Sequence, residues 1–110
     1  MPHFMTRWQF TAGSAKALVE RPNDRTGAAK ALVEGFGGKM LHYYFSLGDY
    51  DGLGISEFPD TKAAAACSLA AMATGAFTRF ETVTLLTAGE AEAAMRLVHD
   101  TKSGYEPPHA

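Results

Sequence analysis

The alternation of apolar and polar residues predicts a strand at the beginning of the chain. Phe4, Trp8 and Phe10 share one parity within residues 3–10, and a period of two is typical of a strand with one buried face. Three later segments are rich in aromatic, aliphatic or β-branched residues and end at glycine or proline. We expect these further strands at 39–47, 52–58 and 77–86.

Apolar residues at helical spacing, together with capping residues, predict the helices. Thr11 and Asp60 stand where N-cap residues belong, and Thr87 with Glu90 forms a capping-box pattern. Gly37-Gly38 ends one helix, because glycine adopts the left-handed conformation at low cost. The expected helices span 12–20, from 23 or 24 to 36, 61–74 and 88–102.

The order of these elements, β-α-β-β-α-β followed by a C-terminal helix, is typical of the ferredoxin-like split β-α-β fold. Right-handed crossovers place the helices on one face of a four-stranded antiparallel sheet, with strand order 4-1-3-2. We therefore expect one α+β domain over residues 1–102 and a flexible tail over 103–110, which contains Pro107-Pro108.

The residues around Tyr50 predict the hairpin between the second and third strands. A turn centred on Asp49-Tyr50 places His42 opposite Glu57 and Tyr43 opposite Ser56. Large side chains of the second strand then face small residues of the third strand. The small residues leave room for a helix or a bulky side chain to lie across the third strand.

The opposite parity of this hairpin carries Tyr44, Leu53 and Ile55. These residues form an apolar surface with no helix left to cover it. We expect either a partner on this surface or the last helix folded back over it.

Composition narrows the function classes. The chain has 110 residues, a net charge of −2 and no cluster of Lys or Arg, so general attraction to nucleic acid is excluded. The N-terminus lacks the apolar core of a signal peptide, and no run is long enough to span a membrane. We expect a cytoplasmic location, and we expect the single cysteine, Cys67, to be a buried, inert thiol.

The chain resembles the GYD family over roughly residues 3 to 95. The matching residues are Thr11 with Gly13, Gly37-Gly38-Lys39, Tyr43-Tyr44, Leu47-Gly48-Asp49-Tyr50-Asp51, Glu57, Pro59-Asp60 and Arg79-Phe80-Glu81-Thr82. This family is similar to the dimeric α/β-barrel superfamily, in which two ferredoxin-like sheets pack face to face. The resemblance implies a homodimer or a higher homo-oligomer that assembles through sheet faces.

His42 and Glu57 are the candidate catalytic residues. A carboxylate opposite an imidazole orients the ring and raises its pKa, as a general base requires. The alternative is a polar cross-strand pair at the rim of a dimer interface. No spacing of His, Cys or carboxylates matches a zinc pattern and no glycine-rich phosphate loop follows a strand, so no metal and no cofactor are expected.

Aromatic residues are the candidate ligand contacts. A pocket between the helices and the sheet would be lined by Trp8, Tyr43 and Phe45, with Tyr44 and Tyr50 as further contacts. Tyr50 is also expected to pack its ring and to bond a neighbour through its hydroxyl, while the flanking aspartates cap the turn.

Two functions remain open. The first is a small self-assembling protein that binds a small apolar or aromatic molecule. The second is a cofactor-independent enzyme, similar to a monooxygenase or an isomerase, that acts on an aromatic substrate with His42 as its base.

Overall fold

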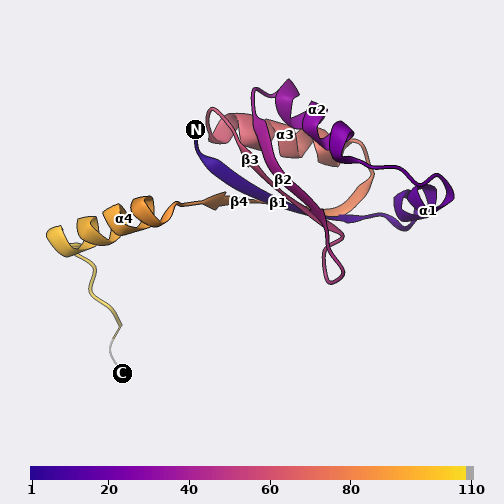
Figure 1. Cartoon of the computed structure of the whole chain (residues 1–110). Coiled ribbons are helices and arrows are strands. Elements are labelled where there is room, and N and C mark those ends of the chain that lie inside the picture. Colours follow the sequence, from indigo (N-terminus) through magenta and orange to yellow (C-terminus); the bar gives the residue numbers. More distant parts are fainter. Residues whose placement is uncertain (109–110) are drawn as a thin grey trace.

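Four antiparallel strands form one sheet, and two helices cover one of its faces (Figure 1). The computed structural model describes residues 1–108, and these contain four strands and four α-helices. The elements are β1 (His3–Phe10), α1 (Ala12–Glu20), α2 (Thr26–Gly35), β2 (Lys39–Phe45), β3 (Gly52–Glu57), α3 (Thr61–Ala73), β4 (Phe77–Leu85) and α4 (Ala88–Asp100).

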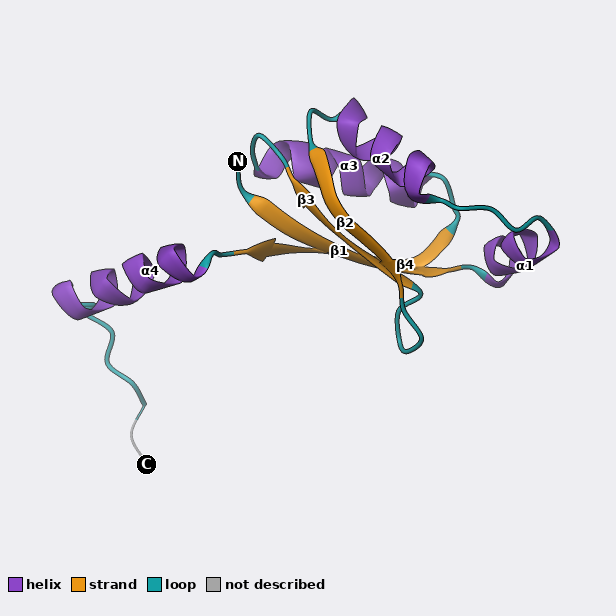
Figure 2. Cartoon of the chain, viewed as in Figure 1, coloured by secondary structure: helices purple, strands orange, loops and turns teal. Residues whose placement is uncertain are grey.

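The sheet order is β2-β3-β1-β4. Counted from the opposite edge this order is 4-1-3-2, so every strand has the neighbours that the ferredoxin-like pattern predicts. Helices α2 and α3 lie over the same face of the sheet, whereas α1 lies beyond one end of it (Figure 2). The chain thus has the expected ferredoxin-like α+β fold.

Helices α1, α3 and α4 begin where the capping residues predicted, whereas α2 begins at Thr26 and not at residue 23 or 24. Thr11 Oγ1 accepts a hydrogen bond from the Ser14 amide at 3.1 Å, and Asp60 accepts one from Ala63 at 2.8 Å. Thr87 and Glu90 form the complete capping box. Each of these side chains satisfies an amide that has no partner inside its helix.

The predicted register of the β2–β3 hairpin is wrong by two residues. Phe45 pairs with Gly52, and Tyr43 pairs with Gly54, because β2 ends at Phe45 and six residues, 46–51, connect the strands. The same register leaves His42 opposite Ile55. A second departure is a one-residue register shift at Leu41, which places Met40 opposite Ser56 and Lys39 opposite Glu57. Because a shift of two residues preserves side-chain parity, large residues of β2 still face glycines of β3.

The core lies between the sheet and the helices α2 and α3. Phe4 and Phe58 are each 1% exposed, and their rings meet edge to face with 5.8 Å between centroids. Val33 from α2 and both Ala64 and Cys67 from α3 complete this cluster. Burial raises the pKa of the Cys67 thiol, in agreement with the expected inert cysteine.

The other face of the sheet carries no helix of residues 1–108. Helix α4 does not fold back over it, but projects away from the end of β4 (Figure 1), which excludes one of the two expected coverings. By strand parity the residues on this face, called the open face below, include Met5, Arg7, His42, Tyr44, Leu53, Ile55, Glu81, Val83 and Leu85.

Residues 103–108 of the predicted tail form neither helix nor strand, and residues 109–110 lie outside the described residues. In the part of the chain that the structure describes, every helix is too short or too polar to cross a bilayer.

Candidate functional site

Trp8 lies across the middle of the sheet on its helix-covered face. Gly52 is the neighbour of Trp8 on β3, and a Cβ added to Gly52 would come within 2.5 Å of two indole carbons. A Cβ on Gly54 would lie 3.8 Å from a third indole carbon. The two glycines therefore provide the space in which the indole crosses β3.

Because it crosses β3, the indole contacts aromatic rings on both sides. It stacks on Tyr43 of β2 with 5.5 Å between centroids and on Phe80 of β4 with 6.0 Å between centroids. Three strands thus contribute to one row of rings. Distances of this size and near-parallel planes are typical of favourable aromatic pairs.

The row closes into a cycle of six aromatic side chains. Phe80 contacts Phe77 edge to face, and Phe77 stacks on Phe10 with 5.4 Å between centroids. Phe10 contacts Phe45, and Phe45 contacts Tyr43 edge to face. This set, called the aromatic floor below, consists of Trp8, Phe10, Tyr43, Phe45, Phe77 and Phe80.

A cavity of about 600 Å³ lies above the aromatic floor. Its walls come from α1, from the connection between α1 and α2, and from the inner sides of α2 and α3. Leu18, Ala29 and Ala71 are typical of the mostly small or aliphatic wall residues. Among the described residues that line it, the charged ones are Arg21 and Arg25, and neither Asp nor Glu is present.

Arg25 and Tyr43 both line this cavity. Both also line a neighbouring depression on the outer side, which Asp24, Tyr44 and Phe45 share. Burial raises the pKa of the Tyr43 phenol, while the positive charge of Arg25 lowers it and the negative charge of Asp24 raises it. Arg25 therefore acts electrostatically on the polar end of the aromatic floor.

Asp24 is held by its own local bond. Its Oδ1 accepts a hydrogen bond from the Thr26 amide at 2.8 Å, and this bonding lowers the pKa of the carboxyl group. Asp24 thereby satisfies an amide at the beginning of α2 and lines the outer depression only. No ion pair within residues 1–108 joins it to Arg25.

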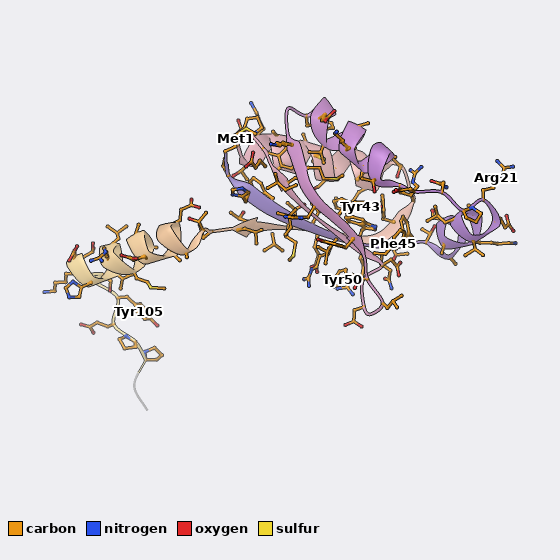
Figure 3. All side chains as sticks on the ribbon, in the orientation of Figure 1. Met1, Arg21, Tyr43, Phe45, Tyr50 and Tyr105 are labelled. Atoms are coloured by element: carbon orange, nitrogen blue, oxygen red, sulfur yellow. The ribbon has the colours of Figure 1, made fainter. Side chains whose placement is uncertain are left out.

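The structure divides the predicted ligand contacts between two faces. Trp8 and Tyr43 line the cavity as predicted, whereas Phe45 does not; it contacts Tyr43 and lines the outer depression. Tyr44 lines only the outer depression. Figure 3 shows Tyr43 between the sheet and the helices and Tyr50 on the opposite side of the sheet. A single pocket that includes Tyr50 is therefore excluded.

Tyr50 belongs to a polar cluster on the open face. Two guanidinium groups lie over its ring, with the Cζ of Arg7 4.3 Å and the Cζ of Arg79 4.8 Å from the ring centroid. Its hydroxyl accepts a hydrogen bond from Arg79 at 2.8 Å, and interaction with the Glu81 carboxylate raises the pKa of Tyr50. The expected packed ring and bonded hydroxyl are confirmed.

The aspartate next to Tyr50 acts differently from the prediction. Asp51 does not cap its own turn; its Oδ2 accepts a hydrogen bond from the Phe10 amide at 2.8 Å. Its own amide donates to the Trp8 carbonyl at 2.8 Å. Asp51 therefore fastens the hairpin loop to the end of β1, beside the aromatic floor.

The predicted pairing of His42 with Glu57 is wrong. Because of the shifted register, His42 lies opposite Ile55 and Glu57 lies opposite Lys39. Glu57 instead contacts His3, with 3.1 Å between its Oε1 and the ring Nε2. His42 also lies on the open face, away from Trp8. A catalytic role for His42 stays a prediction, without Glu57 as its orienting carboxylate.

Sequence reasoning missed Phe77, Phe80 and Arg25. Phe77 and Phe80 are an odd number of residues apart, which in a regular strand places them on opposite faces. A register shift between Gln9 and Phe10 brings both to the same face, and no sequence signal marks this irregularity. Arg25 lies in a connection with no periodic pattern. The described residues hold no group of His, Cys, Asp and Glu suited to a metal ion.

Comparisons with known proteins agree with this architecture. The family model of the GYD domain matches residues 4–95. No curated protein matches the chain. The crystal structure of MtbAldR superposes with a TM-score of 0.52 at 11% sequence identity, over 78% of this chain and 53% of that one. The chain thus spans about half the length of that protein, and the likeness shows the fold alone.

Proposed function

The chain belongs to the GYD domain family, and we propose that it is a self-assembling protein that binds a small aromatic molecule in the cavity above its aromatic floor. The observation that carries this proposal is the closed cycle of six rings beneath an apolar cavity.

The size and lining of the cavity support a small-molecule ligand. Its volume of about 600 Å³ lies within the range of pockets that enclose small ligands, and such pockets combine apolar walls with a few polar groups. The polar groups here include Ser14, Ser56 and Asn23. An apolar ligand of matching size gains stability mainly from the surface that it removes from water.

The floor favours a flat, aromatic ligand in particular. Trp8, Tyr43 and Phe80 lie in a row with nearly parallel planes, so a planar ring system can pack over them. Each well-placed aromatic pair contributes roughly 0.5–1.5 kcal/mol beyond the burial of area. The conformational cost of ordering the floor is low, because its rings already contact one another.

The open face supports self-assembly. Met5, Leu53, Ile55 and Val83 lie side by side on three strands of a face that no described helix covers. A continuous apolar area of this kind is typical of an interaction surface. A second copy of the chain offers the same surface, so a two-fold arrangement with the sheets face to face buries both at once.

The experiment is a titration of the protein with 2-naphthamide, followed through the NMR signal of the indole N–H. Trp8 is the only tryptophan, so this signal reports on the floor alone. We expect it to shift and saturate in the wild-type protein. Ala29→Phe adds a ring to the cavity wall, and we expect it to abolish the shift.

The matched control is Ala31→Phe, which adds the same ring to an exposed position of α2 that does not line the cavity. This variant should bind as the wild type does. A wild-type protein whose indole signal is unmoved by the probe, or an Ala29→Phe variant that binds as tightly as the wild type, would overturn the proposal.

A further inference from the structure

The cavity carries a charge opposite to that of the whole chain. The chain has a net charge of −2, yet the charged residues among those described around the cavity are two arginines and no carboxylate. From this contrast we infer that the ligand is an aromatic carboxylic acid whose carboxylate binds Arg25 at the cavity mouth. This inference rests on the proposed binding function and specifies the class of ligand.

Arg25 is placed to make this contact. It lies in the connection that leads into α2. With Tyr43, the polar end of the aromatic floor, it lines both the cavity and the outer depression, and its positive charge acts on the Tyr43 phenol. No acidic side chain within residues 1–108 forms an ion pair with Arg25. Its guanidinium is therefore free to pair with an acid from outside the chain.

Arg21 contributes less than Arg25. Figure 3 shows Arg21 at the far end of α1, directed away from the sheet, although it borders the cavity. One guanidinium close to the floor matches one carboxylate, because both groups are planar and bind through two parallel hydrogen bonds. A phosphate carries more negative charge than this single partner balances.

The position of Arg25 also fixes the orientation of the ligand. Arg25 is exposed, so the carboxylate remains at the mouth, where water still solvates it, while the ring system lies on the floor. A charge buried in the apolar interior would lose its hydration at a cost that one ion pair does not repay. The aromatic body therefore enters first and the acid group stays outermost.

The test compares 2-naphthoate with 2-naphthamide at neutral pH, again through the indole N–H signal of Trp8. The two probes share one ring system and differ only in the charged group. In the wild-type protein we expect naphthoate to bind about threefold to fivefold more tightly, because a two-bond ion pair with an exposed arginine is favourable but weaker than a buried one. In Arg25→Gln the preference for naphthoate should be lost, so that the two probes bind with equal affinity.

Arg96→Gln is the matched control, because Arg96 lies on α4, far from the cavity, and pairs with Glu92 at 2.8 Å. It should keep the wild-type preference. Equal binding of both probes to the wild-type protein, or a preference for naphthoate that persists in Arg25→Gln, overturns this inference and leaves the proposed binding function intact. Failure of both probes to bind overturns the binding function itself, and this inference falls with it.

Discussion

The indole of Trp8 rests directly on the backbone of Gly52. A Cβ at that glycine would lie within 2.5 Å of two ring carbons, which is less than any van der Waals contact allows. The indole is only 6% exposed and is flanked by Tyr43 and Phe80, so an added methyl group can displace it only toward the cavity. The absence of a single side chain on β3 thus allows Trp8 to link the rings of β2 and β4 into one floor.

Gly52→Ala is therefore expected to destabilise the protein and to displace the indole. Overpacking a well-filled site costs roughly 1–3 kcal/mol, and urea unfolding should show a loss of this size. Gly27→Ala is the control, because Gly27 lies within α2 and a Cβ there meets nothing within 4 Å. It should stabilise by about 0.5–1 kcal/mol. Equal stability of Gly52→Ala and the wild type would show that the indole is not confined.

Much of this fold follows from the sequence alone. The bounds of β1 and α1 agree with the predicted 3–10 and 12–20, because alternating residues and a strong N-cap mark them. The sequence also predicts that large residues of β2 lie opposite small residues of β3 in the hairpin. The register of the hairpin was not predictable, since turn residues favour several loop lengths, and neither the long loop nor the irregularity at Leu41 leaves a sequence signal.

The cluster around Tyr50 predicts a dependence of stability on pH. Hydrogen bonds from Tyr50 and Arg7 lower the pKa of Glu81, so the folded state favours its ionised form. The resulting stabilisation is complete above the ordinary pKa of 4.5 and is lost as the pH falls through the lower pKa of the folded protein. The difference in unfolding free energy between the wild type and Glu81→Gln should therefore shrink on acidification.

Tyr50→Phe separates the contribution of the hydroxyl from that of the arginines. The variant retains the ring beside Arg7 and Arg79. It loses the hydroxyl of Tyr50, whose hydrogen bond makes the largest contribution to the lowered pKa of Glu81. Carboxyl NMR titration should show a higher pKa of Glu81 in this variant than in the wild type. An unchanged pKa would mean that Arg7 alone accounts for the shift.

The candidate site was predictable only in part, for a physical reason. Trp8 and Tyr43 were found because a large aromatic residue on the helix-facing parity must lie under a helix. Tyr44 and Tyr50 were grouped with them because aromatic type alone does not distinguish the two faces of a sheet. The pairing of His42 with Glu57 failed because it depended on the hairpin register, which the six-residue loop between Phe45 and Gly52 shifts by two residues.

Removal of the cap of helix α4 is expected to lower the stability of that helix alone. Thr87 and Glu90 close the capping box, and α4 projects away from the sheet (Figure 1), so its stability depends on local bonds. Thr87→Ala should cost about 1 kcal/mol of helix stability. We expect faster amide exchange within α4 and an unchanged unfolding midpoint for the sheet.

The control for this prediction is Thr101→Ala at the other end of the same helix. The Thr101 amide, not its side chain, makes the bond there, to the Val98 carbonyl, so exchange in α4 should stay as in the wild type. A lower unfolding midpoint of the sheet in Thr87→Ala would instead show that α4 packs against folded structure, such as a second copy of the chain.

Ile55→Lys tests assembly through the open face. Ile55 lies in the middle of this face, between Met5 on β1 and His42 on β2, so in a two-fold dimer two new ammonium groups would face an apolar surface. A buried charge without a partner is strongly unfavourable, and we expect the dissociation constant to rise at least about a hundredfold. Because the face is open in a single chain, the monomer should remain folded. Sedimentation velocity measures the oligomeric state, and circular dichroism measures whether the monomer is folded.

Ala65→Lys is the control. It adds the same charge to an exposed position of α3, on the opposite side of the sheet, and should leave the oligomer intact. A wild-type protein that sediments as a monomer at micromolar concentration would contradict the proposed assembly, and an Ile55→Lys variant that remains oligomeric would move the interface to another surface.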